Sequence, residues 1–265
     1  MTYPDRPDGG SVLHWREGAV AHIRFNRPQT LNALDVSMTA ALHAACTEID
    51  ADSAVRVLVI AGEGRAFLAG GDVAVMAVAP VTVAQDLIRE MHGTILVLNR
   101  MRVPVIAQVH GVAAGAAIGI LMACDLVAAA EGTRFSLAFS AIGASADSSS
   151  TWGLPRVMGL RNALRFALLA ETVDAAQARQ IGLISAVLPA PELAPTVGRW
   201  AATIAASAPL ALAAIKRLLR SSLDHPLVEH LDLEAEAFLA CARTKDFAEG
   251  AAAFLAKRAP RFEGR

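Results

Sequence analysis

Two stretches of small residues could bring main-chain N–H groups to a ligand. Residues 110–117 read HGVAAGAA, residues 62–72 read GEGRAFLAGGD, and each follows a short apolar run. Small residues let a ligand approach the backbone closely, and the first N–H groups of a helix have no partner within it. Such groups attract negative charge. The pattern indicates a site for an anion or a polarised oxygen, although a closely packed core helix would explain residues 110–117 equally well.

One carboxylate stands in a later loop of small and hydroxyl side chains. Asp147 precedes three serines and a threonine in residues 145–151, SADSSST. A carboxylate beside a pocket can act as a general acid or base. The same position also suits a helix N-cap, whose side chain accepts a hydrogen bond from the first turn of the following helix. The sequence leaves both interpretations of Asp147 open.

The elements that must position these loops alternate between strand and helix. Short β-branched or apolar runs at residues 12–15, 19–25, 55–61 and 103–109 are typical of strands, and the first two form a hairpin. The apolar residues that follow 103–109 predict a helix ending near Cys124. We therefore expect the α/β class for the first part of the chain.

The pattern changes toward the C-terminus. From residue 161 it is almost wholly helical, and only residues 183–188 interrupt it as a strand. We expect a core over residues 1–195 and a C-terminal helical module over residues 196–265.

Composition and charge exclude several classes of protein. The chain has 265 residues, 54% of them apolar, with 24 basic and 25 acidic residues and no dense basic stripe. Such a balance argues against a nucleic-acid partner. Cys46, Cys124 and Cys241 are too few and too far apart for a disulfide framework or a zinc site. We expect no metal and a reducing, cytoplasmic setting.

Neither a membrane span nor a secretory signal is expected. Residues 103–130 are long enough to cross a bilayer, but Gln108, His110 and several glycines interrupt the run. Residues 1–18 contain no apolar stretch long enough for a secretory signal.

An ordered set of motifs resembles the crotonase superfamily, the enoyl-CoA hydratase/isomerase proteins. The motifs are NRP with LNAL over residues 26–34, RAFLAGGD over 65–72, and HGVAAG at 110–115 running to ACD at 123–125. The resemblance continues through AAQA at 175–178 and GLI at 182–184 to FLAKR at 254–258. Each motif is modest alone, but the ordered set is specific and covers nearly the whole chain.

The resemblance implies an α/β fold, a spiral of ββα turns with a C-terminal helical oligomerisation module, assembled as a trimer or a dimer of trimers. It implies an acyl-CoA substrate, with coenzyme A entering as part of that substrate and no separate cofactor. The family's two main-chain donors to the thioester oxygen fall on Gly71 and Ala116. Each donor of this kind stabilises an oxyanion by roughly 3 kcal/mol.

By the same resemblance, the coenzyme A moiety lies near Ala69, with Arg27 and Leu31 beside it. Lys257 reaches a phosphate in this interpretation, although a solvated lysine explains that residue equally well. Phe139 and Trp152 could line an acyl pocket, or could belong to the core.

The resemblance also restricts the reaction. The two glutamates of the family's hydratases fall on Gly119 and Phe139, and neither side chain can move a proton. Asp147 instead matches the acid/base aspartate of isomerase-type relatives. We therefore expect an enoyl-CoA double-bond isomerase.

Two alternatives stay open. One is hydratase or hydrolytic dehalogenase activity on another CoA ester, in which Asp147 and His92 match the nucleophile and base of 4-chlorobenzoyl-CoA dehalogenases. A histidine on a helix is more often a surface or packed residue, so His92 carries this alternative only weakly. The other is a non-catalytic acyl-CoA-binding protein.

Overall fold

A six-stranded sheet forms the centre of the protein, in a computed structural model that describes residues 9–265. The strands β1 (Val12–Glu17) and β2 (Val20–Phe25) form the predicted antiparallel hairpin. The remaining strands run parallel to β2 in the order β3 (Val57–Gly62), β4 (Val105–Val109), β6 (Leu126–Ala130) and β9 (Ala186–Leu188). The α/β prediction is confirmed.

A second, smaller sheet lies where the chain leaves the first. It contains β5 (Val112–Ala114), β7 (Arg134–Ser136) and β8 (Thr172–Asp174), and the bridges Leu34–Gly71 and Leu68–Ala113 add to it. The chain therefore repeats one unit: a strand of the large sheet, a short strand or bridge, and then a helix. This repeat is a spiral of ββα turns. The three-residue strands β5 and β8 escaped prediction because they are too short to show a period of two.

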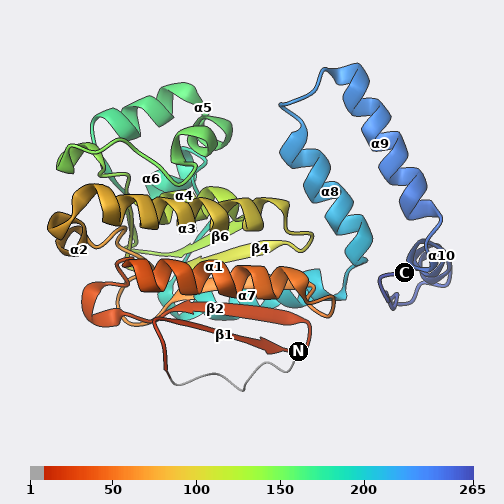
Figure 1. The fold of residues 1–265 in the computed structure, drawn as a ribbon. Helices are drawn as coiled ribbons and strands as arrows, with labels where there is room; N and C mark the ends of the chain where they lie inside the picture. Colours follow the sequence, from red (N-terminus) through yellow and green to blue (C-terminus); the bar gives the residue numbers. More distant parts are fainter. Residues whose placement is uncertain (1–8) are drawn as a thin grey trace.

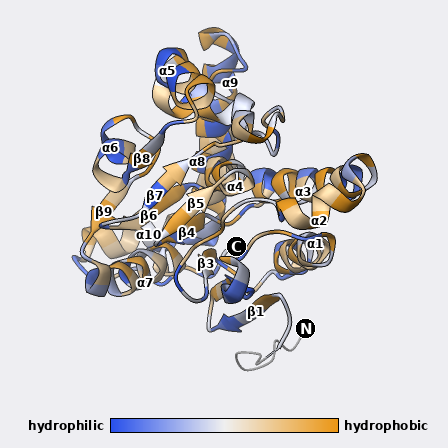
Figure 2. Ribbon diagram, turned by 90° about the vertical axis from the view of Figure 1, so that its left-hand side faces the viewer, coloured by the Kyte–Doolittle hydropathy of each residue, from blue (hydrophilic) through white to orange (hydrophobic). Residues whose placement is uncertain are grey.

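Helices cover both faces of the large sheet (Figure 1). Alternate residues of a strand point to opposite faces, so Leu58 and Ile60 of β3 enter a core shared with α1 (Val36–Ala51), α3 (Pro80–Arg100) and α4 (Ala116–Ala123). Val57 and Val59 instead contact the cluster formed by α7 (Ala190–Ala206). Strands buried on both faces read as continuous apolar runs. Figure 2 shows mainly hydrophobic colouring around β4, β5 and β6.

Helix α7 contains the expected domain boundary at residues 195–196. Its residues Leu193, Val197 and Ala201 are buried against the sheet, so the whole helix belongs to the core. The helices that stand apart begin after it: α8 (Pro209–Ser221), α9 (Leu227–Ala242) and α10 (Lys245–Leu255) (Figure 1). The change in composition could be seen in the sequence, but the helix that crosses the expected boundary could not.

Two helices differ from the sequence prediction. The helix α5 (Ser150–Leu168) begins eleven residues before the predicted start at residue 161. Pro155 and Gly159 lie inside it, and Gly159 has non-helical angles (φ 74°), so the segment resembled a loop. The short helix α2 (Val73–Val78) was not predicted, and its residues are not buried. The helix α6 (Ala175–Gln180) lies within the stretch after residue 161 that was expected to be mainly helical.

No single helix within residues 9–265 is both long and apolar enough to cross a bilayer. Helices α7 and α8 pass such a test only as a pair, and they are bent by 110° at the break between them.

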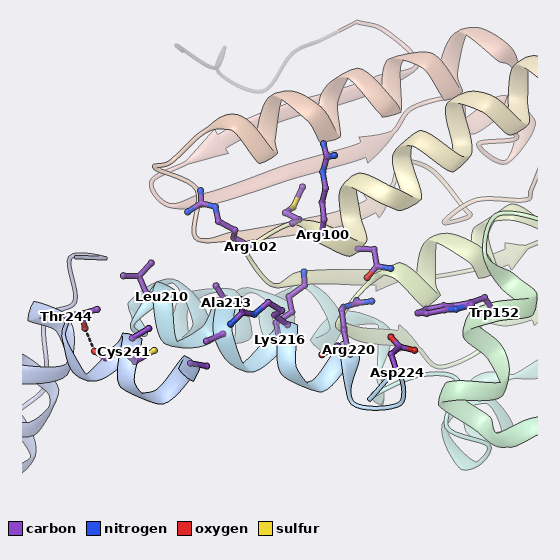
Figure 3. Close-up of a pocket in the computed structure, with 17 residues that line it drawn as sticks. Arg100, Arg102, Trp152, Leu210, Ala213, Lys216, Arg220, Asp224, Cys241 and Thr244 are labelled. Carbon is purple, nitrogen blue, oxygen red and sulfur yellow. Dashed lines mark hydrogen bonds between the residues drawn. The ribbon is translucent and has the colours of Figure 1, made fainter. Parts of the chain in front are cut away.

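Asp125 attaches α8 to the core. Its carboxylate accepts hydrogen bonds from Lys216 Nζ at 2.8 Å, from Arg220 at 2.7 Å and from the Val105 N–H at 2.8 Å. The two cations lie along one wall of a groove of about 630 Å³ between the core and helices α8 and α9 (Figure 3). Burial lowers the pKa of Lys216, and Asp125 opposes that shift. A single carboxylate thus pairs with two cations.

We expect Asp125→Ala to lower the free energy of unfolding by about 2–4 kcal/mol, because it leaves two partly buried cations without their counterion. The matched control is Asp224→Ala, which breaks a more exposed pair with Arg156 at 3.4 Å and should cost at most about 1 kcal/mol. Urea denaturation measures both. Equal effects of the two variants would show that Asp125 does not attach α8.

Candidate active site

A largely apolar cavity of about 260 Å³ lies between the two sheets' loops and helix α3. Gly71, Ala116 and Asp147 all line it. Of the described residues in its wall, Asp147 alone has an ionisable side chain. Within residues 9–265, no group of three or more His, Cys, Asp or Glu side chains could hold a metal ion. The cavity therefore brings the backbones of Gly71 and Ala116 together with one carboxylate.

The Gly71 N–H faces away from the neighbouring chain segment. Leu34 donates to the Gly70 carbonyl at 2.7 Å and accepts from the Asp72 N–H at 2.8 Å. Because successive N–H groups of an extended segment point to opposite sides, these two bonds turn the Gly71 N–H to the other side. The donor is thereby left available to a ligand.

Helix α4 supplies the second donor. It begins at Ala116, whose N–H has no carbonyl four residues earlier within the helix to bond to. Gly115 before it has φ 56°, and Gly70 has φ 93°. A Cβ on Gly115 would lie 3.4 Å from Gly70 Cα, so the backbones before the two donors are in contact. This contact is what brings both donors to one wall of the cavity.

Buried polar side chains hold these loops in place. Asn32 is fully buried and donates from Nδ2 to the carbonyls of Ala66, at 2.8 Å, and Phe67, at 3.1 Å. Arg27 lies between Asp35 and Asp72, at 3.2 Å and 3.3 Å. Its guanidinium thus anchors the residue that follows Gly71.

The predicted coenzyme A contacts lie beside this anchor. The Leu31 carbonyl accepts from the Ala69 N–H at 3.1 Å, and Ala69 lines the cavity. Arg27, Leu31 and Ala69 are therefore neighbours, as the resemblance implies. Because Arg27 is already paired with two carboxylates, its role as a coenzyme A ligand stays a prediction.

Asp147 does not cap helix α5. The N-cap is Ser149, which makes no side-chain capping bond, and the Asp147 carboxylate instead accepts a hydrogen bond from Ser148 Oγ at 2.9 Å. Two residues of this loop have a left-handed backbone, Ser148 (φ 53°) and Ser149 (φ 64°). Non-glycine residues seldom adopt such angles, and they concentrate at functional sites. The capping interpretation of Asp147 is wrong.

Apolar side chains complete the cavity. Ala84, Leu87, Ile88 and Met91 form one stripe of α3, and Phe139 comes from the loop before Asp147. The stripe follows the helical period and could have been found from the sequence. Phe139 thus lines this cavity, and its role in an acyl pocket stays a prediction. The α3 stripe was not predicted.

Three predicted site residues lie elsewhere. His92 is exposed and follows Met91 by about 100° around α3, which turns it away from the stripe. Trp152 lines the groove of Figure 3, where Arg156 stacks on its ring at 3.8 Å. Lys257 is exposed after α10 and does not line the cavity. Of the two aromatic residues proposed for an acyl pocket, the structure brings only Phe139 to this cavity.

Gly119 of α4 has no room for a side chain. A Cβ there would lie 2.0 Å from the Ser148 carbonyl oxygen and 2.6 Å from Ser148 Cβ. Real Cβ atoms do not approach other atoms so closely, so any larger residue would displace the loop that carries Asp147. The loop and the helix therefore require glycine at this position.

We expect Gly119→Ala to destabilise the protein by roughly 1–3 kcal/mol through overpacking. Gly198→Ala is the matched control, because Gly198 also lies in a helix but a Cβ there meets nothing within 4 Å. Alanine is the better helix former, so the control should gain about 0.5–1 kcal/mol. Urea denaturation gives both values. A Gly119→Ala variant as stable as the control would refute the steric argument.

Comparison with known proteins gives a consistent result. The family described as enoyl-CoA hydratase/isomerase matches residues 16–265. The 1,2-epoxyphenylacetyl-CoA isomerase of Escherichia coli K12 is 36% identical over 258 residues, which cover 96% of this chain and 98% of that protein. The 2,3-dehydroadipyl-CoA hydratase of the same organism is 34% identical over 94% of this chain and 97% of its own. The crystal structure of an enoyl-CoA hydratase from Polaromonas sp. JS666 superimposes with a TM-score of 0.90 at 31% identity, covering 96% of this chain and 100% of the other.

Proposed function

Because this chain belongs to the enoyl-CoA hydratase/isomerase family, we propose that it is an enoyl-CoA isomerase that shifts a double bond through a thioester enolate. The family membership confirms the resemblance to the crotonase superfamily and an acyl-CoA substrate. The finer assignment rests on one observation: Asp147 is the ionisable side chain in a cavity whose wall also carries the Gly71 and Ala116 donors.

The proposed reaction needs one base and one oxyanion site. The Asp147 carboxylate takes a proton from C2 of a 3-enoyl thioester, and the electron pair moves onto the thioester oxygen. The N–H groups of Gly71 and Ala116 stabilise that enolate, each by roughly 3 kcal/mol. The protonated Asp147 then returns the proton to C4, which gives the 2-enoyl thioester and restores the carboxylate.

The two-glutamate hydration route finds little support in this cavity. By the resemblance, the glutamates of hydratases fall on Gly119 and Phe139. Phe139 is an apolar part of the wall, and a side chain on Gly119 would collide with Ser148. Hydrolytic dehalogenation is disfavoured for a similar reason, because its expected base, His92, is exposed outside the cavity wall.

We also propose that the protein assembles with copies of itself, as a trimer or a dimer of trimers in the cytoplasm. Large apolar side chains on the helices that stand apart support assembly: Phe238 is 65% exposed, Phe254 84% and Leu255 82%. Exposed apolar patches of this kind mark interfaces. Sedimentation velocity would test it, and a monomer at micromolar concentration would refute it.

The test of the activity is proton NMR of 3-hexenoyl-CoA in D₂O with the wild-type protein. We expect movement of the double bond to C2, with deuterium at C2 and C4 to the extent that the proton held by Asp147 exchanges with D₂O. Binding of the thioester without exchange or shift would support a non-catalytic acyl-CoA-binding protein instead. Addition of water to crotonyl-CoA in the absence of any shift would support a hydratase.

A further inference from the structure

The side chain of Ser148 is hydrogen-bonded to the carboxylate of Asp147. It is fully buried, and its Oγ donates to Asp147 Oδ1 at 2.9 Å. In the part of the chain that the structure describes, no other side chain or backbone N–H is bonded to this carboxylate. Oδ2 is thus the oxygen left to meet a substrate proton.

The position of Ser148 is fixed by the helix that carries the second main-chain donor. Its carbonyl oxygen and Cβ occupy the space beside Gly119, one turn after Ala116 on α4. Its left-handed backbone (φ 53°) persists although such angles are costly for a residue with a Cβ. The contact therefore fixes the Asp147 loop relative to Ala116.

We propose that Ser148 is a positioning residue for the reaction: its hydroxyl orients the Asp147 carboxylate so that Oδ2 faces the substrate. This inference rests on the proposed isomerase function. A hydrogen bond to a carboxylate is stronger than one between neutral groups, so it can hold the carboxylate in one orientation. Ser148 also lines the cavity, but its hydroxyl is bonded to the base, so its loss should appear in turnover rather than in binding.

Ser148→Ala tests this, with Ser150→Ala as the matched control. Ser150 is equally buried in the same turn, but its Oγ donates to the Asp147 backbone carbonyl, at 2.7 Å, and not to the carboxylate. With 3-hexenoyl-CoA, we expect Ser148→Ala to lower kcat about 10-fold with KM nearly unchanged, because a carboxylate without this bond is held less precisely against C2. Ser150→Ala should keep kcat and KM within a few fold of the wild type.

Each other outcome has a separate meaning. If both variants lower kcat to the same extent, or if Ser148→Ala raises KM and leaves kcat unchanged, Ser148 does not position the base and the inference is wrong. If Ser148→Ala behaves as the wild type, its hydroxyl does not position the base. Wild-type protein without isomerase activity would overturn the proposed function itself, a result visible before any variant is made.

Discussion

Replacing Asp147 with asparagine is expected to reduce kcat for 3-enoyl-CoA isomerisation by about 10²–10⁴-fold, the usual contribution of a positioned general base. The amide is nearly the same size as the carboxylate, so the cavity should keep its shape. An amide cannot accept the C2 proton, and no second ionisable side chain lines the described cavity. Exchange of the C2 proton with D₂O should therefore be lost together with the double-bond shift.

The measurement is proton NMR of the thioester in D₂O, with thermal stabilisation by the substrate as a check on binding. Asp224→Asn is the control, because Asp224 lies in the separate groove of Figure 3. It should retain wild-type turnover. Isomerisation that persists in Asp147→Asn would contradict the assignment of Asp147 as the base.

Replacing Ala116 with proline is expected to lower kcat by about 10²–10³-fold, the effect of removing one oxyanion donor. A main-chain donor is seldom accessible to mutagenesis, but Ala116 is the first residue of α4. Proline is well tolerated at that position, since its ring suits the helical φ and the missing N–H has no intrahelical partner. The substitution can therefore delete the donor while the helix persists.

Ala116→Ser is the control for this change, because serine alters the side chain and keeps the N–H. It should retain activity to within a few fold. Circular dichroism and the melting temperature show whether the proline variant is folded. A folded Ala116→Pro enzyme with wild-type kcat would mean that the thioester oxygen is not bound at this N–H.

Local patterns in the sequence were sufficient for most of the scaffold. Apolar runs located the hairpin and the strands β3 and β4, because strands buried on both faces must be apolar throughout. The two glycine-rich loops were found for a similarly local reason: a close approach of backbone to ligand needs small side chains. Short elements such as β5 and α2 contain too few residues to show a period, so pattern reasoning missed them.

Only the tertiary structure decided which of the candidate residues act together. Gly71 and Ala116 line one wall because Gly70 and Gly115 touch, a contact between loops 45 residues apart in sequence (115 minus 70). Trp152 and His92 were also candidates, His92 the weaker of the two, but neither lines the cavity.

The sequence by itself therefore indicated the kind of chemistry that we propose: main-chain donors for an oxyanion and one aspartate, with Gly119 and Phe139 where the resemblance places the glutamates of hydratases. Only the structure shows that the buried Ser148 donates to this aspartate, and that Ser148 has room because residue 119 is glycine. The physical reason is the distance along the sequence over which each interaction acts. Backbone preference and hydrophobic period depend on neighbouring residues, whereas a collision between residues 119 and 148 depends on how the whole chain packs.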